Sequence, residues 1–278
     1  MQARTLVVVA LLTTMCACGG NGGGGPTTPS AQTPTLPGLS ITPATDLIKI
    51  KASETFTANA TFSDGSSRSV QATWGSDTPS VATIDSTGRA TGVAPGLATI
   101  YADYQGMRAT RLLRVVPDYQ GTWQGDWSVT GCGDEGDWTG VCQQAPNGTL
   151  WALTLVITQT RDSVTGTTDF YGDDLVNLPG PVSGTIGQSG HLVVSGTYTN
   201  TIKGNLVETT VSNWETITTD NERMTGRFRE TTRVAGLRGS VYHDGELRIV
   251  TKTSATPLMA VAEASVCLRR DLQLTRRR

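Results

Sequence analysis

The side chains that most often carry out chemistry are scarce in this chain. It has only two histidines, His191 and His243, and both lie beside glycines typical of turns. Neither accompanies a Gly-x-Ser-x-Gly elbow or a His-Glu-x-x-His pair, the motifs that bring an imidazole to a nucleophile or to zinc. We therefore expect both histidines to be surface residues of turns, and we predict that the protein is not an enzyme.

Carboxylates gather at two places, and carboxylate oxygens are ligands that calcium prefers. The two groups are Asp134, Glu135 and Asp137, and Asp169, Asp173 and Asp174. Neither group has the spacing of a defined calcium loop, so we interpret both as solvated loops. The cysteines and histidines also lack the spacing of a zinc site. We expect no metal and no cofactor.

Cysteine chemistry is more informative, and it begins at the N-terminus. Residues 1–18 carry Arg4, an apolar run from Leu6 to Leu12, and then small residues up to Cys18. This is the pattern of a secretory signal peptide, and the apolar run is too short to span a bilayer as a permanent helix. The pattern predicts export.

The end of this signal, Met15-Cys16-Ala17-Cys18, resembles the bacterial lipobox, in which a small residue precedes the cysteine that becomes lipidated. Ala17 is small and Met15 is not, so the resemblance assigns lipidation to Cys18, with Cys16 as the alternative. It implies an exported, lipid-anchored protein. Gly19 is not the Asp that resembles an inner-membrane retention signal, so the outer membrane is the preferred location.

Residues 19–38 are rich first in glycine and then in proline and threonine. Glycine-rich segments are flexible and proline-rich segments are stiffer, so we interpret 19–38 as a tether. Lipid chains of a modified cysteine would hold the protein on a membrane, because each buried methylene contributes about 0.8 kcal/mol. The tether would hold the folded part away from that surface.

Three further cysteines, Cys132, Cys142 and Cys267, agree with an oxidising compartment. Cys132 and Cys142 flank a short loop, so a local disulfide is our first prediction, contributing about 2 to 3 kcal/mol. Cys267 is the alternative partner, because the last strand of a closed barrel lies beside the first. Trp138, inside the flanked loop, is the tryptophan that we expect to be free to stack on a sugar or another ligand.

Two stretches of alternating apolar and polar residues must position these groups, and the first covers residues 39–117. Its segment from Trp74 to Ile100 contains Gly88 and Gly96 at predicted tight turns. On these residues, the range 39–117 resembles the group 2 bacterial Ig-like domain, with Trp74 in the core. The resemblance implies an Ig-like β-sandwich that serves as a spacer or adhesive module.

The second stretch, residues 118–278, repeats a short motif in which glycine follows a β-rich run, as in Val164–Gly166 and Val182–Gly184. Such glycines permit the close approach that a curled sheet requires. About eight strands fit this length, which predicts an antiparallel up-and-down β-barrel, with a second β-sandwich as the alternative. The sequence from Gly121 to Trp123 resembles the Gly-x-Trp opening of lipocalin-like barrels, and we expect Trp123 to be buried at one end.

The fold class is thus all-β, and each of the two ranges is expected to fold by itself. A formal net charge of −2 gives no basic field for nucleic acid. The sequence favours a non-enzymatic envelope or surface lipoprotein, in which an Ig-like spacer or adhesion module presents a barrel. Its partners would be the membrane, through the lipid, and a surface polysaccharide or protein. The alternative is a carrier that holds a small apolar ligand inside the barrel, unless Leu153, Leu155 and Ile157 meet large inward partners.

Overall fold

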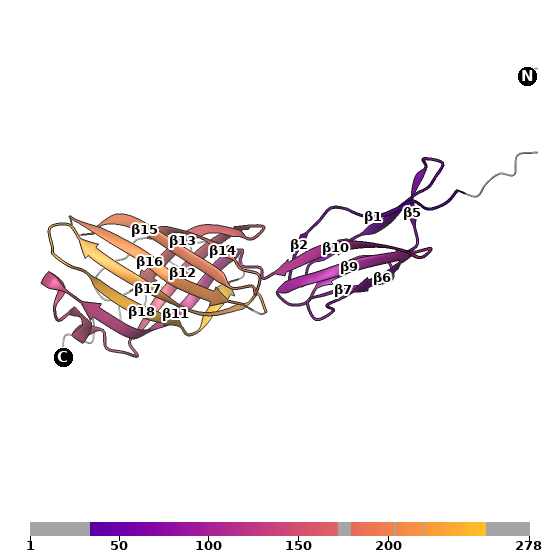
Figure 1. Cartoon of the computed structure of the whole chain (residues 1–278). Coiled ribbons are helices and arrows are strands. Elements are labelled where there is room, and N and C mark those ends of the chain that lie inside the picture. The colour runs from indigo at the N-terminus through magenta and orange to yellow at the C-terminus, as the bar shows by residue number, and fades with distance from the viewer. Residues whose placement is uncertain (1–33, 172–178, 203, 219, 254–278) are drawn as a thin grey trace, which may run out of the picture. The chain divides into compact units, whose positions relative to one another are not determined.

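A computed structural model describes residues 34–171, 179–202, 204–218 and 220–253, and this part of the chain is built almost entirely from strands (Figure 1). Cys16, Cys18 and Cys267 lie outside the described residues, as do the signal peptide and most of the tether. No helix within the described ranges is long and apolar enough to cross a membrane.

The first half is a sandwich of three small sheets, in the orders β1-β4-β5, β2-β10-β9-β6 and β3-β8-β7. Its strands are β1 (Gly38–Thr42), β2 (Leu47–Lys49), β3 (Ser53–Thr55), β4 (Thr57–Thr61), β5 (Ser67–Val70), β6 (Thr73–Ser76), β7 (Ala82–Ile84), β8 (Arg89–Gly92), β9 (Gly96–Tyr104) and β10 (Met107–Val116). These strands pair antiparallel except β2 with β10, and the isolated bridge between Ile50 and Gly92 is also parallel.

The sandwich core consists of small aliphatic side chains around one large ring. That ring belongs to Phe56, which is fully buried, whereas Trp74 is half-buried and packs against the edge of the core. Gly88 is the residue that lets Trp74 approach. It has a φ of +84°, and a Cβ there would lie 3.1 Å from the Trp74 ring and 2.3 Å from the Phe56 carbonyl oxygen. The predicted turn at Gly88 is confirmed, but the ring at the centre is Phe56.

The second half is a closed antiparallel barrel of eight strands, which confirms the predicted barrel and excludes a second sandwich. Its strands are β11 (Gly121–Asp134), β12 (Leu150–Thr160), β13 (Ser163–Tyr171), β14 (Gly180–Ile186), β15 (Leu192–Ile202), β16 (Asn205–Ile217), β17 (Arg223–Val234) and β18 (Val241–Leu247), and β18 continues as β19 (Val250–Thr253). β18 pairs with β11 and so closes the barrel.

Asp118 follows the last strand of the sandwich and precedes the first strand of the barrel. Its carboxylate accepts hydrogen bonds from Lys49 Nζ at 2.6 Å and from Lys252 Nζ at 3.4 Å. Its backbone N–H donates to the side-chain oxygen of Asn221 at 2.9 Å. The two lysines outweigh the cost of partial burial, so the pKa of Asp118 lies below its ordinary value.

Alternation decides which side chains fill the barrel. Along β12, Leu153, Leu155 and Ile157 are buried, while the residues between them face outward. Leu155 lies opposite Trp123 on β11. Leu153 lies opposite Phe170 on β13, whereas the partners of Ile157 on both sides are glycines. All three leucine and isoleucine side chains belong to one buried cluster with Trp123 and Phe170, as a filled core requires.

The repeated glycines allow neighbouring strands to approach closely. A Cβ at Gly166 would lie 1.9 Å from the Val156 carbonyl oxygen, and a Cβ at Gly184 would lie 2.0 Å from that of Val193. Distances this short forbid any side chain at these two positions. The glycine of the repeated motif thus serves the close approach that was predicted for a curled sheet.

One irregularity interrupts the barrel wall between β18 and β19. Leu247 pairs with Trp127 and Thr251 with Gln124, so the later strand has one residue more than β11 over this stretch. The extra residue forms a β-bulge, which turns Arg248 and Ile249 outward together. A Cβ at Gly125 would lie 1.7 Å from the Ile249 carbonyl oxygen, so only glycine fits beneath the bulge.

Candidate functional site

The loop between Cys132 and Cys142 is cross-linked, which confirms the predicted disulfide. It contains two short 3-10 helices, η1 (Gly136–Trp138) and η2 (Val141–Gln144). Asp134 ties the loop to the end of β11, because its carboxylate accepts hydrogen bonds from the backbone N–H groups of Gly140 at 3.0 Å and Cys142 at 2.9 Å. The loop is therefore a fixed cap with its own hydrogen bonds.

Trp138 does not have the exposure that a stacking platform needs. Only 7% of its surface is exposed, because η1 turns the indole toward the protein. The prediction that this ring stacks on a ligand at the surface is thus corrected. Burial follows from the two helical turns, which the glycine-rich sequence of the loop did not indicate.

The nearby carboxylates are used for internal bonds. Asp137 accepts a hydrogen bond from the Arg238 backbone N–H at 2.8 Å and contacts its guanidinium at 3.2 Å, and these bonds hold the pKa of Asp137 below its ordinary value. Glu135 accepts a hydrogen bond from the Ser240 hydroxyl at 3.2 Å. Among the residues that the structure describes, no group of three or more potential ligands could hold a metal ion.

His243 differs from its prediction. It lies within β18, not in a turn, and its ring packs edge to face against Trp151 with 4.9 Å between centroids. Burial lowers the pKa of His243. The nearby Gly245 suggested a turn, but its role is to admit a ring, since a Cβ there would lie 2.6 Å from Phe228. His191 does follow a turn, as predicted, and its Nδ1 lies 2.9 Å from the Ser189 hydroxyl.

A cluster of four rings fills the middle of the barrel. The ring cluster consists of Trp127, Phe170, Trp214 and Phe228, all of which are buried. The Phe228 ring lies 5.0 Å from each of the other three between centroids. Contacts at this distance exclude an open channel through the centre.

One end of the barrel is sealed by Trp123 and Tyr119. Trp123 is fully buried, as predicted, and its Nε1–H donates to the Tyr119 carbonyl oxygen at 2.8 Å. The Tyr119 hydroxyl lies 2.8 Å from the Gly190 carbonyl oxygen and 3.2 Å from that of Thr216. Burial raises the pKa of Tyr119, so its hydroxyl stays protonated. At this end the indole of Trp123 and the hydroxyl of Tyr119 are both buried and hydrogen-bonded.

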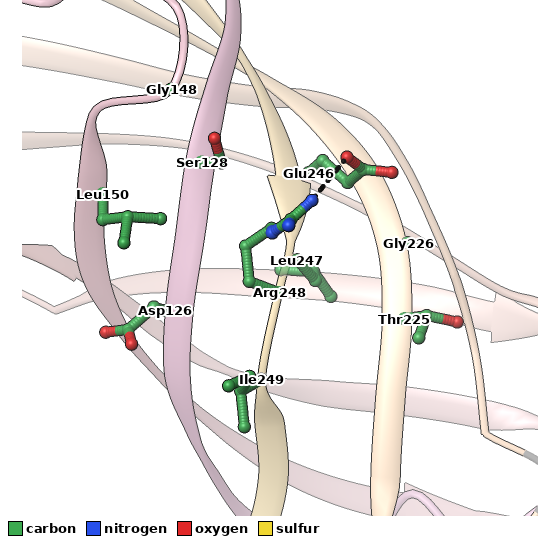
Figure 2. A pocket seen from close by; sticks show the side chains of 10 residues that line it. All are labelled: Asp126, Ser128, Gly148, Leu150, Thr225, Gly226, Glu246, Leu247, Arg248 and Ile249. Carbon is green, nitrogen blue, oxygen red and sulfur yellow. Dashed lines mark hydrogen bonds and ion pairs between the residues drawn. The ribbon is translucent and has the colours of Figure 1, made fainter.

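The outer wall carries a groove of about 610 Å³ over the β-bulge (Figure 2). The wall residues that line it are Asp126, Ser128, Gly148, Leu150, Thr225, Gly226 and the stretch from Glu246 to Ile249. Two aliphatic side chains are unusually exposed there, Leu150 at 59% and Ile249 at 71%. The groove is thus an amphipathic surface feature of small-molecule size.

Charges frame this groove. Arg248 lies across its middle and contacts Glu246 at 3.4 Å (Figure 2). Arg227 contacts the same carboxylate at 3.6 Å. Asp126 lies on the opposite rim, and its carbonyl oxygen accepts the Arg248 backbone N–H at 2.8 Å. Both signs are present, so the groove favours contact with an uncharged or mixed surface over a strongly charged one.

Comparison with known families identifies the class of the first half. Residues 36–104 match the bacterial Ig-like domain (group 2). The predicted resemblance is confirmed for this segment.

Among curated proteins, the chain is similar to Ice-binding protein 1 of Shewanella frigidimarina, with 44% identity over 69 residues. That similarity covers 24% of this chain and only 8% of the relative. Among solved structures, it matches surface layer protein SbsC domains 4–9 and domains 5–6, each at a TM-score of 0.29, with 13% and 15% identity. Each match covers 76% of this chain, and they cover 31% and 98% of those structures.

Proposed function

We propose that the protein is a non-enzymatic, exported lipoprotein of the cell envelope, in which the Ig-like sandwich spaces a barrel from the membrane. The observation that carries the proposal is the combination of an Ig-like domain with a closed barrel whose centre is filled by the ring cluster. Such a barrel offers its outer wall for contacts. Lipidation at Cys18 would supply the anchor and residues 19–38 the tether, and the outer membrane is the preferred location.

The outer groove is the part of the wall that we assign to adhesion. Leu150 and Ile249 expose apolar surface beside polar rims, as in a surface that contacts a polysaccharide or a protein. The segment shared with Ice-binding protein 1 supports a binding function of this non-enzymatic kind, because that protein is named for binding ice. The class of partner, a polysaccharide or a protein, is itself proposed.

The anchor is tested by metabolic labelling with a fatty acid. Cys18→Ser is expected to abolish the label and to release the protein from the membrane fraction. Cys16→Ser is the matched control and should keep both the label and the membrane location. If the label persists in Cys18→Ser and disappears in Cys16→Ser, the lipidated residue is Cys16. If neither the wild type nor the variants are labelled, the lipid anchor is refuted.

Adhesion is tested by sedimentation of the full chain with isolated envelope polysaccharide. Leu150→Ser combined with Ile249→Ser should reduce binding while leaving the melting temperature nearly unchanged, because both side chains are exposed. Leu112→Ser is the control, since Leu112 on the Ig-like sandwich is similarly exposed at 56%. Equal binding by wild type and both variants would remove the groove from the proposal.

A further inference from the structure

The groups of the outer groove lie in a definite order across the barrel wall. Leu150 belongs to β12 and Asp126 to β11, while Arg248 and Ile249 form the β-bulge between β18 and β19. Figure 2 shows the two bulge residues between Asp126 on one side and Thr225 of β17 on the other. This order determines which partner can match the groove.

The side of the groove formed by β11 carries a carboxylate without a partner. The Asp126 side chain is exposed, and within the described ranges its carboxylate has no hydrogen bond and no ion pair. Gln124 and Ser128, two positions away on either side, are uncharged. The Asp126 carboxylate is therefore available to a cation of another molecule.

The bulge carries the matching cation. Arg248 contacts Glu246 at 3.4 Å, but Arg227 contacts the same carboxylate at 3.6 Å. Arg227 can therefore keep Glu246 neutralised when Arg248 turns to another carboxylate. Both arginines are exposed, and ion pairs between exposed side chains contribute little and are readily exchanged.

The strand register brings these two unlike charges into one small patch. The Arg248 N–H donates to the Asp126 carbonyl oxygen at 2.8 Å, so the two residues lie opposite each other on neighbouring segments. In a contact with two-fold symmetry, residue i of one copy meets residue j of the other, and j meets i. A two-fold axis parallel to the strands, between β11 and β18, would thus bring Asp126 of each copy to Arg248 of the other.

The same axis brings the apolar groups together. Ile249 is 71% exposed and lies next to this axis, so the two Ile249 side chains would pack against each other. β12 and β17 flank β11 and β18 on either side of the axis. Leu150 of one copy would therefore face the recess that Thr225 and Gly226 line on the other. Charge and shape of the patch both match a rotated copy of the patch.

We propose that the partner of the outer groove is a second copy of this chain, so that adhesion is homophilic. The inference rests on the assignment of the groove to adhesion made above, and it names the partner. A contact of this size lies at the low end for specific interfaces, so the association is weak and transient. The lipid anchor proposed above would gather many copies on one surface, where multivalent contact strengthens adhesion.

Other partners match the groove less well. A sugar ring would find no aromatic side chain to stack on, because none of the residues that line the groove is aromatic. A polyanion would meet the carboxylates of Asp126 and Glu246, and a polycation would meet Arg248 and Arg227. The matching partner carries both signs beside apolar side chains, which is the composition of the groove itself.

The test is sedimentation velocity of the full chain from micromolar to millimolar concentration. Every sample carries Cys18→Ser, so that lipid chains cannot associate the protein by themselves. The sedimentation coefficient should rise with concentration toward that of a dimer. Leu150→Ser combined with Ile249→Ser should weaken this association about tenfold, because both side chains lie in the contact.

Charge reversal identifies the contact. Asp126→Arg and Arg248→Asp should each weaken self-association about tenfold or more, because each variant puts like charges face to face. An equimolar mixture of the two variants should associate again, since every arginine in the mixed dimer faces a carboxylate. Arg233→Asp is the matched control: it makes the same change of charge on an exposed residue at the other end of β17, and it should leave association unchanged.

Three results would overturn the proposal. The first is a sedimentation coefficient of the wild type that does not change up to millimolar concentration. The second is a loss of association in Arg233→Asp equal to that in Arg248→Asp. The third is a mixture that stays monomeric although both variants keep the melting temperature of the wild type. If a monomeric wild type still sediments with envelope polysaccharide, the groove keeps its adhesive role and only the second copy is refuted.

Discussion

Replacing Trp123 by alanine is the sharpest test of how the barrel is sealed. The side chain is fully buried and lies on β11 opposite Leu155 of β12, and its N–H donates to the Tyr119 carbonyl oxygen at 2.8 Å. The Lys252 ammonium lies 5.1 Å from the ring centroid, within range of a cation–π contact. Trp123→Ala removes all three interactions at once.

The expected cost is large. Emptying a core tryptophan site costs about 3 to 5 kcal/mol, and the Tyr119 carbonyl left without its donor adds about 1 kcal/mol. We therefore expect a loss of about 4 to 6 kcal/mol in the free energy of unfolding. For a domain of this size the corresponding fall in melting temperature is roughly 10 to 20 °C.

Urea unfolding of the full chain, followed by tryptophan fluorescence, measures this loss. Five of the six tryptophans, all except Trp74, lie in the barrel range, so the signal reports mainly on the barrel. Trp123→Phe is the matched control, because it keeps an aromatic ring and loses only part of the volume and the N–H. It should cost clearly less than the alanine variant. A loss under about 2 kcal/mol for Trp123→Ala, or equal losses for both variants, would refute the reasoning.

Three further outcomes follow from other contacts. Cys132→Ser combined with Cys142→Ser should lower the free energy of unfolding by about 3 kcal/mol, since the bridge closes a loop between residues separated by 10 positions; an unchanged urea midpoint would contradict this. Burial lowers the pKa of His243 from 6.5, so the unfolded chain binds that proton more readily. The contribution of neutral His243 to the free energy of unfolding should therefore be present in full above about pH 6.5 and be lost as the pH falls toward the pKa of the folded protein. Urea midpoints measured over this pH range should fall less in His243→Gln than in the wild type. Gly125→Ala should destabilise the barrel strongly, because its Cβ would overlap the Ile249 carbonyl oxygen. An unchanged melting temperature in calorimetry would contradict this close approach beneath the bulge.

Local patterns in the sequence predicted much of the architecture. Alternation along residues 150–160 identified the inward Leu153, Leu155 and Ile157, because a strand has a period of two. The repeated glycines indicated a curled sheet, and the spacing of Cys132 and Cys142 indicated a bridge within reach. Each of these inferences depends on residues close together in the chain.

The corrected residues depend on pairing between distant segments. Gly245 resembles a turn residue in sequence, but Phe228, on another strand, occupies the space above it and keeps His243 in a strand. The burial of Trp138 likewise requires the cap to fold back. The outer groove follows from an extra residue between Leu247 and Thr251, and only comparison with β11 reveals it. The pattern of residues along one strand does not show which residues of a distant strand it pairs with.

The order of strands around the barrel also has a consequence for biosynthesis. β11 is the first barrel strand to be made, yet it pairs with β18 and β19, which are made last. During synthesis the earlier strands therefore have unpaired edges, and the ring cluster stays uncovered, until the closing strands are made. Folding that depends on contacts so distant in sequence is slow and exposed to aggregation. We therefore expect truncation before Val241 to yield aggregates, and we expect the complete chain to need holding chaperones until the barrel closes.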